Sequence, residues 1–281
     1  FPNIKINIGL NVTSRRPDGF HNIESIFYPV NWKESIEITD RNPDLDLGSL
    51  KHEMVEVGKV RFISYGDAIP GDPNNNLCIK VFRLLEEWFN LPSIDMHLLK
   101  QIPTGAGLGG GSADAAFTLR ALKKFFELRI SDVEAMDLLA KVGSDCPFFW
   151  KNRAAFVYGR GEKLNPIDID LIGWNILLLN PGIHISTKEA YAGVHPADPK
   201  LDLQLLPSIE VEGWQEIVQN DFEASVFPKN PKIKELKEWM YSEGSVYASM
   251  TGSGSTIYGI FKRIPEIPEQ YQQFSSWSGE L

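Results

Sequence analysis

The chain opens with a strict alternation of hydrophobic and polar residues. Over residues 4–12 the hydrophobic positions are Ile4, Ile6, Ile8, Leu10 and Val12, and they alternate with Lys5, Asn7, Gly9 and Asn11. Because successive side chains of a strand point to opposite faces, this pattern predicts a strand. Lys5 and Asn7 then share its polar face.

A turn is predicted directly after this strand, in the sequence RRPDGFH at residues 15–21. Pro17 fixes its own φ, and Asp18-Gly19 supplies residues that tolerate a positive φ. Phe20 and His21 follow at the exit of the turn.

Helical spacing of apolar residues appears next. A helix is predicted from about residue 77, because apolar residues recur one turn apart and the sequence DPNNN before them supplies capping residues. These apolar residues are Leu77, Val81, Leu84, Leu85 and Trp88. Residues 94–102 predict a strand. A second amphipathic helix carries Ala115, Leu119, Leu122 and Phe126. A capping box from Ser131 to Glu134 starts a third helix, which Gly143 ends.

The second half of the chain is richer in strand patterns. Residues 154–158 and 175–180 predict strands, and a loop-rich stretch follows to about residue 211. Asn230-Pro231 starts a helix. Residues 245–261 hold two short β-rich runs around a glycine turn, which is typical of a hairpin or a strand pair. We therefore predict an α+β fold with domains at residues 1–152 and 153–281, since helices and strands do not alternate strictly.

Composition narrows the functional class. The 281 residues, 43% of them hydrophobic, suffice for one large or two medium domains. A formal net charge of −9 opposes binding to nucleic acid, which needs clustered Lys and Arg. Two cysteines without CxxC spacing indicate neither a disulfide framework nor a zinc site. The chain starts at Phe1 with no leader pattern, and no stretch reaches the ~18 apolar residues of a membrane span. We expect a soluble, cytoplasmic protein without a membrane or nucleic-acid partner, as a monomer or weak homodimer.

Five glycines fall within seven positions in the segment PTGAGLGGGSADAA, residues 103–116. The segment is not a Walker loop, although residues 105–110 fit G-x-G-x-x-G. A dinucleotide site is not favoured, because a second capped helix follows where a parallel strand is needed. Glycines let backbone N–H groups approach an anion at a helix N-terminus, so a phosphate site is predicted. The plain alternative is a flexible loop. Ser112 is either the helix N-cap or a hydroxyl ligand for phosphate or Mg²⁺.

Three features together resemble the GHMP kinase superfamily, named for galacto-, homoserine, mevalonate and phosphomevalonate kinases. They are the Lys-containing first strand, the sequence P-x-G-x-G-L-G-G-G-S and the C-terminal glycine turn MTGSGS at residues 250–255. Within the superfamily, RRPDGFHNIESIF (15–27), GSDCPFF (143–149) and PGIHISTKEAY (181–191) resemble the kinases that act on 4-(cytidine 5′-diphospho)-2-C-methyl-D-erythritol in non-mevalonate isoprenoid biosynthesis. The match runs in order over about residues 2–261. It implies a two-domain fold with a ribosomal-protein-S5-like N-terminal half, a ferredoxin-like C-terminal half and ligands in the cleft.

The resemblance implies transfer of the ATP γ-phosphate to the 2-hydroxyl of that acceptor. Asp145 would be the general base and Lys5 would lie beside it, because a nearby ammonium keeps a carboxylate ionised. Without the resemblance, Asp145 would be a turn residue and Lys5 a solvated strand residue. Adenine would lie near Asn76 and Leu77. The ATP phosphates would be bound by Pro103, Gly105, Gly107, Leu108, Gly109, Gly110, Gly111 and Ser112, and by the glycine turn Gly252, Ser253 and Gly254.

The resemblance also assigns the acceptor site. Phe20 stands where the family usually has Tyr, which keeps a face for cytosine stacking and loses a hydroxyl. His21 would hydrogen-bond the cytosine edge, and Phe27 would form a second apolar wall. Asn7, Thr187 and Tyr191 would line the methylerythritol end, with Tyr where some relatives have Phe. The alternative for each is ordinary packing. No cluster of His and carboxylates suggests a resident metal, so Mg²⁺ would arrive with ATP.

Three other functions stay open from the sequence. Another GHMP kinase, of the homoserine or mevalonate type, would share the glycine motifs but not the Asp-Gly-Phe-His turn. A dinucleotide-dependent oxidoreductase would share only the glycines. A non-enzymatic binding module would follow if Lys5 or Asp145 proved misplaced.

Overall fold

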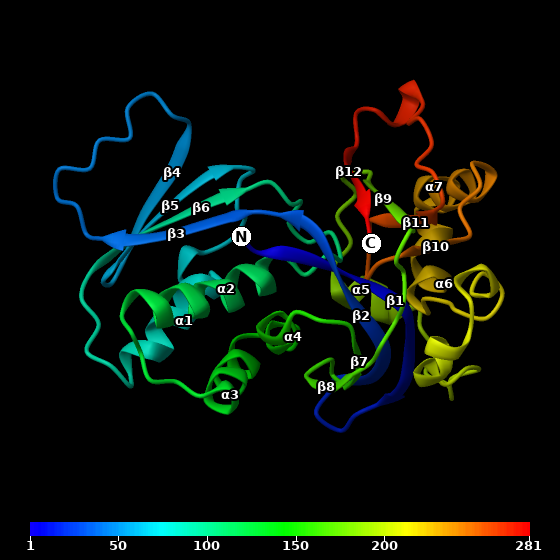
Figure 1. The fold of residues 1–281 in the computed structure, drawn as a ribbon, viewed down its shortest axis with the longest axis horizontal. Helices are drawn as coiled ribbons and strands as arrows, with labels where there is room; N and C mark the ends of the chain where they lie inside the picture. The colour runs from blue at the N-terminus through cyan, green and yellow to red at the C-terminus, as the bar shows by residue number, and fades with distance from the viewer. The chain divides into compact units, whose positions relative to one another are not determined.

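The structure is a computed structural model that describes residues 1–281 (Figure 1). The chain divides into two compact units. The first unit holds residues 1–4, 32–104 and 109–152, and the second holds residues 5–31, 105–108 and 153–281. The division assigns two early stretches of the chain to the second unit. The domain limits 1–152 and 153–281 stay a prediction.

A four-stranded sheet organises the first unit, in the order β3-β6-β5-β4. Its members are β3 (Ser35–Asp40), β4 (His52–Val57), β5 (Val60–Gly66) and β6 (Ile94–Lys100). The β5–β6 pair is parallel and the other two pairs are antiparallel. Helices α1 (Leu77–Glu86) and α2 (Gly110–Phe125) cover one face of this sheet (Figure 1). The covered strands contribute buried apolar residues such as Phe62, Met96 and Leu98.

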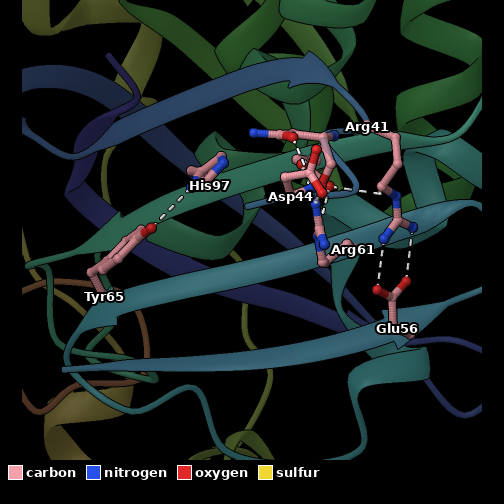
Figure 2. A network of polar contacts seen from close by, with 8 residues as sticks. Arg41, Asp44, Glu56, Arg61, Tyr65 and His97 are labelled. Atoms are coloured by element: carbon pink, nitrogen blue, oxygen red, sulfur yellow. Dashed lines mark hydrogen bonds and ion pairs between the residues drawn. The ribbon is translucent and has the colours of Figure 1, made fainter. Parts of the chain in front are cut away.

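Ion pairs tie the strands of this sheet to the segment after β3 (Figure 2). Arg41 donates two hydrogen bonds to Glu56, at 2.6 and 2.8 Å. Arg61 holds the buried Asp95 in a similar fork, at 2.8 and 2.6 Å. The carboxylate of Asp95 also accepts the backbone N–H of Asn42. These planar guanidinium–carboxylate pairs fix the segment against the sheet, so we assign them a structural role.

The helices of the first unit follow the sequence closely. Asn76 caps α1 by accepting the N–H of Cys78, as the capping sequence predicted. The helix ends at Glu86, so the inclusion of Trp88 was wrong, and that side chain is 46% exposed. The capping box of Ser131 and Glu134 starts α3 (Asp132–Val142), and Gly143 ends it, as predicted. Helix α4 (Cys146–Lys151) was not predicted, although its Pro147 is typical of a helix start.

The second unit contains two four-stranded sheets. The first has the order β1-β2-β7-β8 and consists of β1 (Asn3–Arg15), β2 (His21–Lys33), β7 (Ala155–Gly159) and β8 (Lys163–Pro166). The second has the order β10-β11-β9-β12 and consists of β9 (Asn175–Asn180), β10 (Tyr247–Met250), β11 (Ile257–Phe261) and β12 (Ser275–Glu280). β10 and β11 pair antiparallel, so the predicted strand pair is confirmed. The predicted strands 4–12, 154–158 and 175–180 are confirmed as well.

Three helices complete the second unit: α5 (Thr187–Ala192), α6 (Phe222–Val226) and α7 (Pro231–Ser242). Helix α7 starts after Asn230, as predicted, and buries Ile233, Leu236 and Met240 against β10 and β11. The prediction of a loop-rich stretch up to about residue 211 was wrong in part. A capping box of Ser186 and Glu189 starts α5 there, and a 3₁₀ helix spans Leu203–Ser208. No helix of the chain is long and apolar enough to cross a membrane.

Candidate active site

Lys5 lies on β1 and is buried, with 3% of its surface exposed. Its Nζ donates to Asn7 Oδ1 and, at 3.0 Å, to the carbonyl of Gly107, and it lies 4.7 Å from the ring centre of Phe27. The backbone N–H of Lys5 donates to the carbonyl of Leu108. A buried ammonium needs such acceptors, because burial without them is costly. The polar strand face is therefore an internal, organised one, and the solvated alternative for Lys5 is wrong.

Hydrogen bonds hold the side chain, the backbone N–H and the carbonyl of Asn7. Its Nδ2 donates to Ser25 Oγ at 2.9 Å, and its backbone N–H donates to Thr251 Oγ1 at 3.1 Å. The hydroxyl of Tyr258 donates to the carbonyl of Asn7 at 2.7 Å. These contacts point the Asn7 amide oxygen toward Lys5. Ser25, Thr251 and Tyr258 were not predicted as site residues, since hydroxyls inside strand patterns give no signal of their own.

The glycine segment 105–108 packs against the C-terminal glycine turn. Gly107 has φ +78°, and a Cβ added there would lie 2.0 Å from the carbonyl oxygen of Thr251. Gly252 has φ +55° and approaches Gly107 in return. The amide of the buried Asn220 donates to the carbonyls of Met250 and Gly252, which holds the turn containing Ser253 and Gly254. The two glycine motifs of the sequence thus meet backbone to backbone, which explains why no side chain is present at Gly107.

Helix α2 begins in the first unit at the other end of the glycine segment. Its N-cap is Gly109, which has φ +73° and offers no side-chain cap. The interpretation of Ser112 as N-cap is wrong, because the chain enters the helix through a left-handed residue, Gly109, three positions earlier. Ser112 lies in the first turn of α2. The first N–H groups of a helix lack internal partners, so this end of α2 can bind an anion.

Three buried charged residues form an ion-pair triad beside the start of α2. Lys100 Nζ lies 2.6 Å from Glu34 Oε1 and 3.0 Å from Asp114 Oδ2, and all three residues are buried. A Cβ added at Gly110 would lie 3.3 Å from both Glu34 Oε1 and Lys100 Nζ. Burial and the charge of Asp114 raise the pKa of Glu34 to about 7, against the opposing effect of Lys100. The triad joins β6 and the segment before β3 to the start of α2.

Asp145 and the predicted adenine residues also lie in the first unit. Asp145 precedes α4 in a helical conformation and is half-buried. Its carboxylate makes no cap hydrogen bond, so the start of α4 does not use this carboxylate. Asn76 and Leu77 start α1. Pro103 is half-buried after β6, and Gly111 is exposed on the first turn of α2. Lys5 belongs to the second unit.

The predicted acceptor residues lie in three places within the second unit. The rings of His21 and Tyr191 stack with centres 4.5 Å apart and planes 14° apart. Thr187 and Tyr191 lie one turn apart on α5, and Thr187 is exposed. Phe20 is 55% exposed, and the guanidinium of Arg160 lies 5.1 Å from its ring centre. Phe27 is buried beside Lys5. Arg160 was not predicted, because one Arg in a turn is not distinctive.

Comparisons with known proteins agree with this description. The family described as "GHMP kinases N terminal domain" matches residues 76–160, and "GHMP kinases C terminal" matches residues 202–276. A Bacteroides thetaiotaomicron protein named 4-diphosphocytidyl-2-C-methyl-D-erythritol kinase is 44% identical, over 96% of this chain and 94% of its own length. A Cytophaga hutchinsonii protein of the same name is 45% identical, over 95% and 93%.

A solved structure extends the likeness to the fold. The crystal structure of a 4-(cytidine 5′-diphospho)-2C-methyl-D-erythritol kinase shares a TM-score of 0.76 and 27% identity, covering 99% of this chain and 97% of that one. The predicted α+β, two-domain GHMP kinase fold is confirmed. The chain belongs to the GHMP kinases and, within them, to the family of 4-diphosphocytidyl-2-C-methyl-D-erythritol kinases.

Proposed function

We propose that the protein is an ATP-dependent kinase of non-mevalonate isoprenoid biosynthesis. It transfers the γ-phosphate of ATP to the 2-hydroxyl of 4-(cytidine 5′-diphospho)-2-C-methyl-D-erythritol. The observation that carries this conclusion is the 44% identity over nearly the whole chain to a kinase of that name. Two buried free thiols agree with a reducing cytosol as the place of action.

The ATP phosphates bind the glycine segment in this proposal. Support comes from the left-handed Gly109 and the unpaired N–H groups that follow it on α2. Adenine lies near Asn76 and Leu77 at the start of α1. A side chain at Gly109 would fill the space that the backbone N–H groups need for a phosphate.

Asp145 orients and deprotonates the acceptor hydroxyl, and Lys5 supplies positive charge for the transferring phosphoryl group. Phosphoryl transfer depends on positioning and charge stabilisation. A base that orients the hydroxyl and a fixed cation near the phosphoryl group are the kinds of group that this reaction needs. Support comes from a carboxylate that no helix cap uses and from an ammonium held by Asn7 and Gly107. Phe20, His21, Phe27, Asn7, Thr187 and Tyr191 bind the acceptor.

Mg²⁺ enters with ATP rather than as a resident ion. Mg²⁺ is commonly held by one or two protein oxygens together with substrate phosphates. No group of three or more His, Cys, Asp or Glu side chains could hold a metal in this chain. Ser112, in the first turn of α2, offers a hydroxyl oxygen of the right kind. When bound, the ion would neutralise charge on the phosphates.

The test is ATP consumption by the purified chain across a panel of acceptors. The panel contains the cytidylyl methylerythritol, its uridylyl form, methylerythritol phosphate, homoserine and mevalonate. We expect turnover with the cytidylyl acceptor and at least a tenfold lower kcat/KM with each of the others. Equal turnover of the uridylyl form or of an acceptor without a nucleotide contradicts the cytidine site and indicates another GHMP kinase.

A further inference from the structure

The turn between β7 and β8 places a cation on the ring that is proposed to stack on the base. Ile23 of β2 pairs with Gly159, the last residue of β7, so the turn 159–162 lies beside the start of β2. Phe20 directly precedes β2. The guanidinium carbon of Arg160 lies 5.1 Å from the centre of the Phe20 ring. One face of that ring is therefore covered.

The backbone of this turn is rigidly built. Gly159 and Gly161 have φ of +73° and +105°, a conformation that favours glycine. The backbone N–H of Arg160 donates to Glu162 Oε2 at 2.6 Å, and that of Gly161 donates to the carbonyl of Tyr158 at 3.2 Å. These contacts fix the direction in which the Arg160 side chain leaves the turn. The guanidinium contacts the Phe20 ring, and its charge reaches Asp18, whose pKa is lowered mainly by the hydrogen bond to Arg16 and in addition by Arg160.

The charge of Arg160 is not neutralised by an ion pair, unlike that of its neighbour. Arg16 pairs with Asp18 at 2.9 Å, and Asp18 also accepts the backbone N–H of Phe20. Arg160 forms no ion pair, although the chain carries a formal net charge of −9. An Arg guanidinium is planar and binds phosphate oxygens in a fork, which suits an anionic ligand next to an aromatic ring.

We propose that Arg160 is a specificity-determining residue that binds the diphosphate of the acceptor while the base stacks on the free face of Phe20. The inference rests on the proposed function, since the proposed acceptor carries both a base and a diphosphate. Only a ribose separates the diphosphate from the base, so a cation on the stacking ring has phosphates within reach. The residue recognises the anionic part of the ligand and takes no part in the chemical step.

The test compares two probes, cytidine and cytidine 5′-diphosphate, by calorimetric titration of the full chain and its variants. Arg160→Gln removes the charge and keeps a planar group. Lys163→Gln is the matched control, because Lys163 lies on the same hairpin with its Nζ 5.4 Å from the Tyr158 ring. We expect Arg160→Gln to weaken the diphosphate about tenfold and to leave cytidine within about twofold, as loss of a charged hydrogen bond predicts. Arg160→Lys should recover part of the loss.

Each outcome of this titration either supports or overturns the proposed role of Arg160. A loss confined to the diphosphate, absent in Lys163→Gln and smaller at high salt, supports the inference. Equal losses of affinity for both probes would show that Arg160 only holds the Phe20 ring. Unchanged affinity for both probes would show that Arg160 neither binds the diphosphate nor holds the ring. Both results overturn the inference. If the parent chain binds neither probe, the cytidine site of the proposed function fails, and the inference fails with it. Parent binding without any effect of Arg160→Gln overturns the inference alone.

Discussion

At the scale of single residues, the site consists of side chains whose polar atoms are already oriented. Lys5 is held by an amide oxygen and a carbonyl, and Asn7 is held by Ser25, Thr251 and Tyr258. Such preorganised groups can stabilise developing charge without rearranging during the reaction. The alternation of the first strand predicted that Lys5 and Asn7 share a face. It gave no sign of the hydroxyls around them, which come from β2, from β11 and from the residue after β10.

Replacement of Asp145 by Asn tests the proposed base. Asn keeps the shape of the side chain but accepts no proton, so we expect kcat to fall about 10²- to 10⁴-fold, roughly 3–5 kcal/mol of barrier. The Kd values of ATP and acceptor should stay within about threefold. Because no cap hydrogen bond involves the carboxylate, thermal unfolding should change little. A variant with near-normal kcat would remove Asp145 from the mechanism.

Replacement of Phe20 tests base stacking. Phe20→Ala should raise KM for the cytidylyl acceptor, because base–aromatic stacking contributes about 1–3 kcal/mol, and should leave KM for ATP nearly unchanged. Phe20→Tyr should have a mild effect. Phe20 is 55% exposed, so its replacement should leave the thermal unfolding temperature unchanged. Equal increases of both KM values would argue against a stacking role.

Replacement of His21 tests recognition of the cytosine edge. A site that hydrogen-bonds a polar edge rejects analogues lacking it, so His21→Ala should lower the preference for the cytidylyl over the uridylyl acceptor. The measurement is kcat/KM for both acceptors in parent and variant. An unchanged preference means that His21, which stacks on Tyr191, serves packing only.

At the scale of elements, the start of α2 shows where sequence patterns succeed and where they stop. The apolar stripe predicted the helix, and the glycines predicted a backbone site for an anion. Ser112 was a natural N-cap candidate by residue type, but the left-handed Gly109 caps the helix instead. Residue type alone does not reveal φ. The support from Glu34, Lys100 and Asp114 was likewise hidden, since its three residues come from separate elements.

A pair of glycine variants isolates the role of this helix start. Gly109→Ala places a Cβ at φ +73°, which costs roughly 1–2 kcal/mol and obstructs the approach of phosphate, so KM for ATP should rise about tenfold. Gly173→Ala is the matched control, because Gly173 also has a positive φ, +78°, has nothing within 4 Å of an added Cβ and lies outside the proposed site. Acceptor affinity should change in neither variant. If Gly109→Ala weakened both ligands equally, general misfolding would explain the result.

The triad behind α2 predicts a pH-dependent stability. The pKa of Glu34 is raised from its usual 4.5 to about 7 by burial and by Asp114, whose own pKa is also raised by burial. The folded state therefore holds this proton more tightly than the unfolded state. The stability that Glu34 contributes is greatest below about pH 4.5 and declines until about pH 7, on the order of 3 kcal/mol in total.

Glu34→Gln removes this titration and keeps an acceptor for Lys100. The free energy of unfolding should be measured by denaturant titration at pH 5, 6, 7 and 8 in parent and variant. We expect the parent to lose stability relative to Glu34→Gln between pH 5 and 7 and the difference to level off above pH 7. A difference that is constant across this range would contradict the raised pKa.

At the scale of the whole molecule, the α+β class and most long elements followed from periodicity and caps. The grouping of residues 5–31 and 105–108 with the C-terminal part did not, because it depends on pairing between strands far apart in the chain. Sheet order and the meeting of the two glycine motifs were hidden for the same reason. The function followed from motifs in order over about residues 2–261, and the relatives that are 44% and 45% identical match nearly the whole chain.

The bond that the enzyme forms can be identified directly from its product. The purified chain is incubated with ATP, Mg²⁺ and 4-(cytidine 5′-diphospho)-2-C-methyl-D-erythritol, and the product is followed by ³¹P NMR and by mass spectrometry. We predict one new phosphate monoester at the 2-hydroxyl, formed in equal amount to ADP, with the diphosphate intact. A monoester at another hydroxyl, or ADP formed without phosphorylated acceptor, would contradict this prediction.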